Sequence, residues 1–195
     1  SRQPDSRWYS GGGIYRPVWL WSGAKECIEP EGIRVSTLSC EPARILVEVR
    51  HSGGDVEVEI LDKDGRTAAS GTGGKQEMEI PNAALWSEEA PNLYRCRVRL
   101  SKEGTVMDTA ETTFGIRKVE WSSQGLKING KNTLLRGGCI HHDNGILGAA
   151  AYAESEERRV RILKESGFNA LRISHNPASA ALLEASDRFG MDVMD

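Results

Sequence analysis

The chain has 195 residues, enough for one large domain or two small ones with a substantial hydrophobic core. Its 25 Lys and Arg against 28 Asp and Glu give a net charge of -3 without a basic block, which argues against nucleic-acid binding. The longest apolar runs fall far below the ~18 residues that a membrane span needs. The first residue is not Met, so we expect any targeting signal to lie upstream, and the compartment stays undetermined.

The cysteines point to no metal site. Four are present, widely spaced and without a C-x-x-C pair: Cys27, Cys40, Cys96 and Cys139. This spacing argues against a zinc site, and four cysteines are too few to staple a chain of this length. We expect no metal and no cofactor, and the sequence leaves open whether the cysteines are paired.

The first ~21 residues are rich in Gly and Trp. Ile14, Val18 and Leu20 fit one face of a β-strand. A lone strand is not stable, because its edges need partners. We therefore expect this segment to complete a sheet that lies outside the sequence, or to dock on the residues that follow.

From about residue 33 to 116 the pattern is all-β. Between Tyr94 and Leu100, apolar residues alternate with three arginines, which predicts one buried and one solvent-exposed face. Similar alternation covers residues 45–50, 56–60 and 77–80, with Gly- and Asp-rich turns between. Short strands at this spacing predict an immunoglobulin-like sandwich, and Tyr94, two residues before Cys96, resembles a tyrosine corner.

After Arg117 the pattern changes to alternating strands and helices. Asn129-Gly130 predicts a hairpin turn. The next segments predict a strand–helix–strand–helix–strand order, which implies a parallel sheet. We expect strands over 134–140, 168–173 and 191–194, one helix from Ser155 to Ser166, and a second with Pro177 in its first turn and Gly190 at its end.

Polar residues stand where each of these three strands ends. The first strand is followed by His141, His142 and Asp143, the second carries Arg172 and is followed by Ser174, His175 and Asn176, and the third ends at Asp195. In a (β/α) barrel the active site forms at the C-terminal strand ends. The coincidence of three polar strand ends predicts an active-site rim.

Two other interpretations stay open. The sandwich could be a carbohydrate-binding or scaffolding module without catalysis. Alternatively, His141, His142, Asp143 and His175 could bind a metal, although neighbouring histidines on a strand point to opposite faces and at most one of the first two would face inward. Trp86 could stack on a sugar, but a buried structural role is the stronger interpretation.

Three stretches resemble glycoside hydrolase family 2, the family of β-galactosidases and β-glucuronidases, in the order in which that family has them. They are SRWYSGGGIYRPVWL, WSEEAPNLYRCRVRL with FGIR, and LKINGKNTLLRGGCIHHDNGILGAA followed by ERR-x4-LKESGFNALRISHNP and DRFGMDVMD. The resemblance implies three parts: the last strand of a jelly-roll sugar-binding domain (1–21), an immunoglobulin-like β-sandwich (22–117), and the first third of a (β/α)8 TIM-barrel catalytic domain (118–195).

The resemblance also implies roles for five residues. His142, Asp143, His175 and Asn176 match positions that line the sugar subsite, and Arg172 matches the arginine that keeps the nucleophilic carboxylate ionised. The implied activity is retaining hydrolysis of a terminal β-linked sugar, most often a β-galactoside. Asn176 departs from the Tyr of many relatives, so the identity of the sugar is left open.

The resemblance places both catalytic glutamates on later barrel strands, downstream of this chain. We therefore expect the chain alone to be inactive and to contain no catalytic residue. A partial barrel exposes strand edges and an apolar face, so we also expect self-association. The expected partner is a carbohydrate, with no nucleic acid and no membrane.

Overall fold

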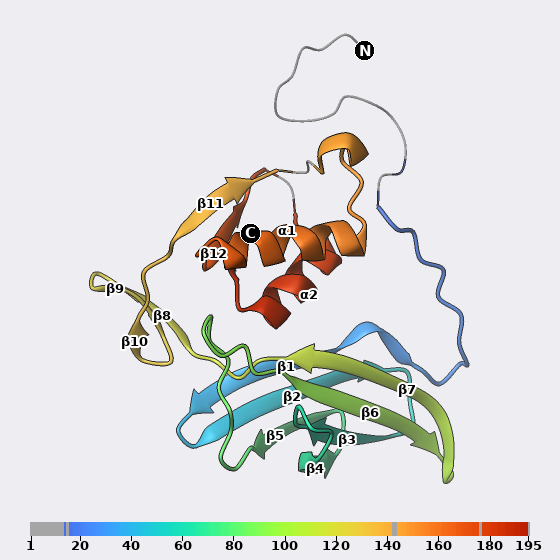
Figure 1. Cartoon of the computed structure of the whole chain (residues 1–195). Helices are drawn as coiled ribbons and strands as arrows, with labels where there is room; N and C mark the ends of the chain where they lie inside the picture. The colour runs from blue at the N-terminus through green and yellow to red at the C-terminus, as the bar shows by residue number, and fades with distance from the viewer. Residues whose placement is uncertain (1–13, 15, 142–143, 176, 195) are drawn as a thin grey trace. The chain divides into compact units, whose positions relative to one another are not determined.

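The computed structural model describes residues 14, 16–141, 144–175 and 177–194 (Figure 1). The described residues form two compact units. The sandwich unit spans residues 20–133, and the barrel unit contains residues 134–194 together with the described residues up to Trp19. The three-part division expected from the sequence remains a prediction, because compact units need not coincide with domains.

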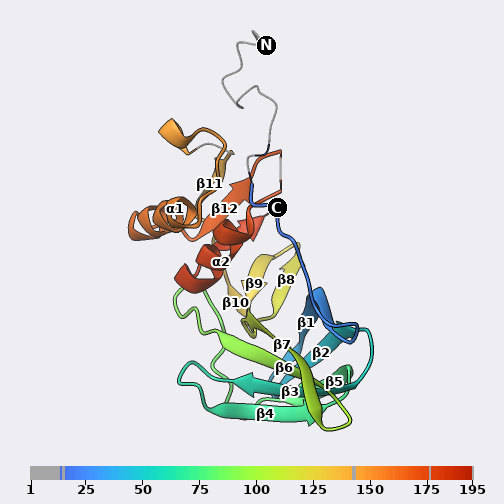
Figure 2. The ribbon, with the colours of Figure 1, turned by 90° about the vertical axis from the view of Figure 1, so that its right-hand side faces the viewer.

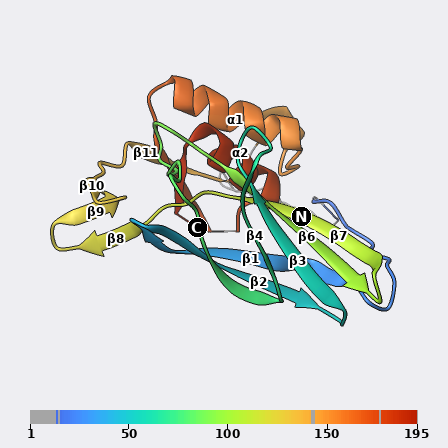
Figure 3. The ribbon, with the colours of Figure 1, turned by 90° about the horizontal axis from the view of Figure 1, so that it is seen from below.

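The sandwich unit contains two antiparallel sheets (Figures 1 and 3). One has the strand order β1-β2-β5, with β1 (Ile28–Cys40), β2 (Ala43–His51) and β5 (Lys75–Glu79). The other has the order β4-β3-β6-β7, with β3 (Asp55–Leu61), β4 (Thr67–Thr72), β6 (Tyr94–Lys102) and β7 (Thr105–Phe114). The fold class is therefore a β-sandwich followed by the start of an α/β barrel, as predicted.

The core of the sandwich unit lies between these two sheets. Alternate residues of β2, β3 and β6 point inward, and the most deeply buried of them include Ile45, Ile60, Cys96 and Val98, each at most 2% exposed. The expected alternation of β6 is confirmed, since Arg97 and its neighbouring arginines lie on the outer face and pair with glutamates. Burial of this apolar surface is the main stabilisation of the unit.

Tyr94 makes the contact that defines a tyrosine corner. Its hydroxyl oxygen accepts a hydrogen bond of 2.9 Å from the backbone N–H of Ala84, and its ring stacks on Phe114 at 5.8 Å between centroids. The hydroxyl thus satisfies a backbone donor in the loop that precedes β6.

Trp86 is a core residue and is only 1% exposed, which excludes a sugar-stacking role. The guanidinium of Arg117 lies 4.5 Å from the indole centroid. A Cβ atom at Gly115 would come within 2.7 Å of the Cβ of Trp86, so only glycine fits there without displacement.

A three-stranded sheet follows the sandwich, with the order β10-β9-β8: β8 (Val119–Ser122), β9 (Gly125–Ile128) and β10 (Lys131–Asn132). Asn129 and Gly130 form the predicted turn, with φ of 51° and 76°. The second hairpin strand is at 131–132, because the two-residue turn brings Lys131 directly opposite Ile128.

The barrel unit has a parallel sheet with two helices (Figure 2). The sheet order is β11-β12-β13, with β11 (Gly137–Ile140), β12 (Ala170–Ile173) and β13 (Asp192–Met194). A 3-10 turn η1 (Gly145–Leu147) precedes the helices α1 (Ala153–Glu165) and α2 (Ala180–Phe189). The predicted strand–helix alternation is therefore confirmed.

Both helices begin at positions that differ from those expected. Helix α1 starts before Ser155, with Tyr152 as an N-cap that makes no side-chain hydrogen bond. Helix α2 starts after Pro177, because the hydroxyl of Ser179 accepts a hydrogen bond from the N–H of Leu182 and so defines the N-cap. Gly190 ends α2 in the left-handed conformation, as predicted.

The strand expected near the N-terminus does not form in the described residues between 16 and 27. Apolar side chains there are exposed, with Val18 75% and Leu20 96% accessible. Arg16 does make a contact within the barrel unit: its guanidinium donates to the carbonyl oxygens of Pro177 at 2.6 Å and Ala178 at 3.5 Å. Across the described part of the chain, no helix is long and apolar enough to cross a membrane.

Candidate functional site

The three strands of the barrel unit end at the same edge of their sheet. They are parallel and in register, with Ile140 opposite Ile173 and Arg172 opposite Met194. His141 follows directly on β11, and Ser174 and His175 follow on β12. The described polar residues at the ends of β11 and β12 are therefore neighbours in space.

The two faces of this sheet differ in chemistry. Leu171 and Ile173 point to the helix side, where they pack with Val160 of α1 and Leu182 of α2. Cys139, Arg172 and Met194 lie across the sheet in one row on the opposite face, because strand residues alternate between faces. The face free of helices is the one that lines the interior of a (β/α) barrel.

Arg172 has defined contacts on this face. Its Nη1 lies 3.6 Å from Cys139 Sγ and 3.5 Å from Ser174 Oγ. The hydrogen bond from Arg172 lowers the pKa of the Cys139 thiol below its usual range, and a hydrogen bond from Ser174 acts in the same direction. Arg172 is thus held beside a thiol whose ionisation it favours.

Two of the predicted site histidines meet at the strand ends. The rings of His141 and His175 lie 5.3 Å apart between centroids and are tilted by 43°. His175 has a φ of 71°, which is rare for a residue with a side chain and places it in a sharp turn after β12. Such strained positions are over-represented at functional sites.

Three of the predicted sugar-binding residues, His142, Asp143 and Asn176, lie outside the described residues, as does Asp195. Within the residues that are described, no group of three or more His, Cys, Asp and Glu is arranged to hold a metal. The metal-site interpretation remains untested, since it relied on His142 and Asp143.

Sequence reasoning did not identify the residues behind the rim. Asn144 and two residues of α1, the buried Glu156 and the partly buried Arg159, form a polar cluster. Cys139 was considered only as one of four widely spaced cysteines whose pairing was left open, and all four are free in this structure. A charged pair at i, i+3 on a helix is a common surface pattern, so the sequence held no signal of its burial.

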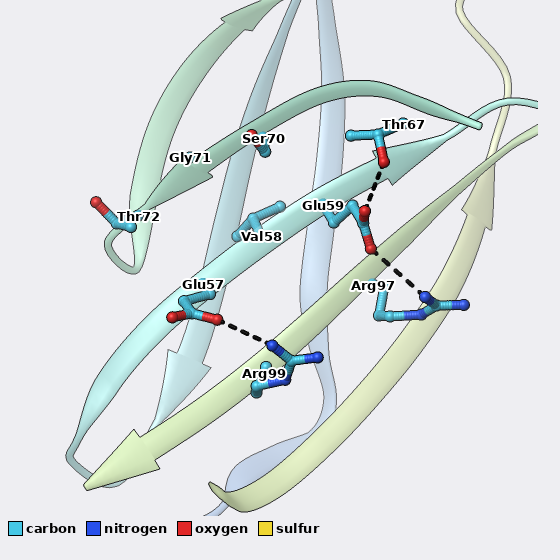
Figure 4. Close-up of a pocket in the computed structure, with 9 residues that line it drawn as sticks. All are labelled: Glu57, Val58, Glu59, Thr67, Ser70, Gly71, Thr72, Arg97 and Arg99. Atoms are coloured by element: carbon cyan, nitrogen blue, oxygen red, sulfur yellow. Dashed lines mark hydrogen bonds and ion pairs between the residues drawn. The ribbon is translucent and has the colours of Figure 1, made fainter. Parts of the chain in front are cut away.

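The sandwich unit has a hollow of its own, of about 420 Å³, over β3, β4 and β6 (Figure 4). Its charged groups are paired with one another: Glu57 with Arg99 at 3.2 Å, and Glu59 with Arg97 at 3.4 Å. None of the nine lining residues is aromatic, so the hollow lacks a ring on which a sugar could stack. It gives little support to the binding-module interpretation.

Comparison with known proteins assigns the family. The model for "Glycosyl hydrolases family 2" matches residues 34–117, and the model for "Glycosyl hydrolases family 2, TIM barrel domain" matches residues 119–195. The fold and these two adjoining matches show that the chain belongs to glycosyl hydrolase family 2.

Individual relatives agree with this assignment. The β-galactosidase BoGH2A of Bacteroides ovatus is 37% identical over 100% of this chain, and a β-glucuronidase of Felis catus is 31% identical over 94%. The chain spans only 25% and 30% of the lengths of these two relatives.

Solved structures show the same similarity. A family 2 glycosyl hydrolase from Bacteroides cellulosilyticus matches all of this chain with a TM-score of 0.89 and 39% identity, and the chain covers 30% of it. A β-glucuronidase from Ruminococcus gnavus in complex with D-glucuronic acid matches 88% of this chain with a TM-score of 0.81 and 26% identity, over 30% of that structure.

Proposed function

We propose that this chain is part of a retaining β-glycosidase that cleaves terminal β-linked sugars, with a β-galactoside as the favoured substrate. The observation that carries the proposal is the meeting of Arg172, His141 and His175 at the C-terminal ends of adjacent parallel strands. The relatives named as β-galactosidases and β-glucuronidases support the same reaction class.

Arg172 is proposed to hold the nucleophilic carboxylate. A guanidinium within hydrogen-bond reach lowers the pKa of a carboxyl group and fixes its orientation through paired hydrogen bonds. Arg172 Nη1 lies 3.6 Å from Cys139 Sγ on the helix-free face of the sheet, and this hydrogen bond lowers the pKa of the thiol. A carboxylate brought to this face from another strand would receive the same stabilisation.

His142, Asp143, His175 and Asn176 are proposed to bind the hydroxyl groups of the sugar that is cleaved. Imidazole, carboxylate and amide groups offer both donors and acceptors, which suits neighbouring hydroxyls of a pyranose ring. Among these residues, His175 is described, and its exposed ring lies beside that of His141.

The chain by itself is proposed to be inactive. Retaining hydrolysis needs an acid/base carboxyl and a nucleophilic carboxylate about 5–5.5 Å apart. In this family both are glutamates on later strands, and residues 117–195 supply about a third of the roughly 250 residues that a barrel takes. The chain alone is also proposed to self-associate through the two edge strands and the uncovered face of its barrel sheet, and a monodisperse monomer in light scattering would contradict this.

The test is hydrolysis of aryl β-galactoside, β-glucuronide and β-mannoside by a chain extended through the full barrel, with the 195-residue chain assayed beside it. We expect galactoside cleavage by the longer form alone. Preferred cleavage of the glucuronide would make a β-glucuronide the proposed substrate instead. The β-glucuronidases of Felis catus and Ruminococcus gnavus favour this second candidate. Absence of any cleavage would favour a non-catalytic role, and cleavage by the short form would refute the argument about missing carboxylates.

A further inference from the structure

One guanidinium holds the chain where it leaves β11. Arg159, on α1, donates to the carbonyl oxygen of His141 at 3.3 Å and to the side-chain oxygen of Asn144 at 2.5 Å. The two acceptors lie three positions apart in the sequence, on either side of His142 and Asp143. The planar fork of an arginine can span two such acceptors, whereas the single ammonium of a lysine cannot do so in the same geometry.

The guanidinium is itself fixed by a buried carboxylate. Glu156, one turn earlier on α1, lies 3.6 Å from Arg159, and the two side chains are only 4% and 18% exposed. Glu156 also accepts a hydrogen bond of 3.1 Å from the amide of Asn144, and the same amide donates to the carbonyl oxygen of Ala150 at 2.8 Å. Asn144, Glu156 and Arg159 therefore form a closed triangle, which we call the loop clamp.

A role in helix stability alone does not account for this arrangement. Charged pairs at i, i+3 stabilise a helix only weakly at the surface, and withdrawing the charges from water costs more than that gain unless further hydrogen bonds compensate. The hydrogen bonds described for Glu156 and Arg159 join α1 to the segment after β11. The exposed ion pair of Arg161 with Glu165 on the same helix makes no contact of that kind, and the two side chains are 50% and 63% exposed.

The segment that the loop clamp holds begins with His141, whose ring lies against His175 at the neighbouring strand end. The backbone of His141 is thus anchored to α1 while its ring lies against that of His175, the predicted sugar-binding residue that follows β12. Loss of the anchor would shift the histidine pair, and displacements of about 1 Å at a reacting centre can cost ~100-fold in rate.

We propose that Asn144, Glu156 and Arg159 are positioning residues of the sugar subsite: the loop clamp sets the place of His141 against His175 and fixes the residues that flank His142 and Asp143. This inference rests on the proposed function of the strand ends. The clamp residues do not touch the sugar and act through the segment that they hold.

The test compares Arg159→Lys and Asn144→Ala with the matched control Arg161→Ala, which removes an exposed arginine from the same helix. In the full-barrel protein we expect the two clamp variants to lose ~10–100-fold in kcat/KM for the aryl glycoside that the wild type cleaves. The control should stay within about twofold of wild type. The conservative variant Glu156→Gln should keep most of the wild-type activity, because the amide oxygen of glutamine can still accept the hydrogen bond from Asn144.

A second readout separates this inference from the proposed function. In the 195-residue chain, cross-peaks between the His141 and His175 rings in NMR spectra should be lost in Arg159→Lys and kept in Arg161→Ala. If no form of the protein cleaves any glycoside but the cross-peaks behave in this way, the clamp stands and the proposed function fails. Cross-peaks that persist in Arg159→Lys, or kcat/KM values of the clamp variants within twofold of the control, would overturn the clamp.

Discussion

The two units of this chain bury their sheets in different ways. In the sandwich unit, two sheets cover each other, and a single core of fully buried side chains runs between them. In the barrel unit, α1 and α2 cover one face of the parallel sheet, while the row of Cys139, Arg172 and Met194 stays on the other. The covered faces provide stability, and the uncovered face is where we propose that the chemistry takes place.

Neighbouring residues of β12 offer the sharpest test of this contrast. Leu171 is 2% exposed on the covered face, so Leu171→Ala should lower the free energy of unfolding by about 2–5 kcal/mol. Arg172→Ala, one residue further on the uncovered face, should change it by no more than about 0.5 kcal/mol. Urea unfolding followed by circular dichroism measures both, and equal losses would remove the distinction between the two faces.

The contribution of the tyrosine corner to the stability of the sandwich unit can be measured by removing its hydroxyl group. Tyr94→Phe keeps the ring that stacks on Phe114 but removes the acceptor of the Ala84 N–H. We expect a loss of about 1–3 kcal/mol, because a part-buried backbone donor is left unsatisfied. Tyr152→Phe is the matched control, since that tyrosine is 60% exposed, and it should leave thermal stability unchanged. A neutral Tyr94→Phe would show that water replaces the hydroxyl.

Two cysteines allow the sandwich core and the uncovered face of the barrel sheet to be compared by the pKa of the same group, the thiol. Burial raises the pKa of Cys96 to about 12, whereas hydrogen bonds from Arg172 and Ser174 lower the pKa of Cys139. Because the thiolate is the form that reacts, iodoacetamide should modify Cys139 at lower pH than an ordinary thiol and should leave Cys96 intact in the folded chain. Mass spectrometry of the alkylated peptides over a pH series measures this.

Arg172→Gln should move the alkylation curve of Cys139 to higher pH, and the control Arg97→Gln should not. Since the lowered pKa belongs to the folded state, the thiolate–guanidinium interaction favours folding at alkaline pH. Its contribution disappears as the pH falls through the lowered value. An alkylation curve of Cys139 that is identical in Arg172→Gln would show that the guanidinium does not act on the thiol.

Sequence patterns predicted the strands whose burial alternates cleanly and failed where the backbone departs from regularity. The β6 pattern of apolar residues and arginines is preserved in the structure, because one face of that strand is buried along its whole length. Strand β1 was not recognised as a single element of 13 residues. It contains Pro30 and Gly32, Glu31 has a φ of 52°, and the pairing with β2 shifts register there.

The candidate site was predictable in outline for a geometric reason. Parallel strands joined by helices bring their C-terminal ends to one edge, so a polar residue after each strand is enough to indicate a rim. The contacts that organise the rim were not predictable. The proximity of Cys139 to Arg172 depends on strand register, and the burial of Glu156 and Arg159 depends on where the segment after β11 folds.

The indole of Trp86 lies directly against Gly115, where a methyl group would come within 2.7 Å of the tryptophan Cβ. In an alignment of family 2 chains, position 115 should therefore stay glycine whatever residue other than glycine stands at 86, because every such residue carries the same Cβ atom. This restriction comes from volume alone, so it would persist in relatives that have changed their sugar or lost their activity.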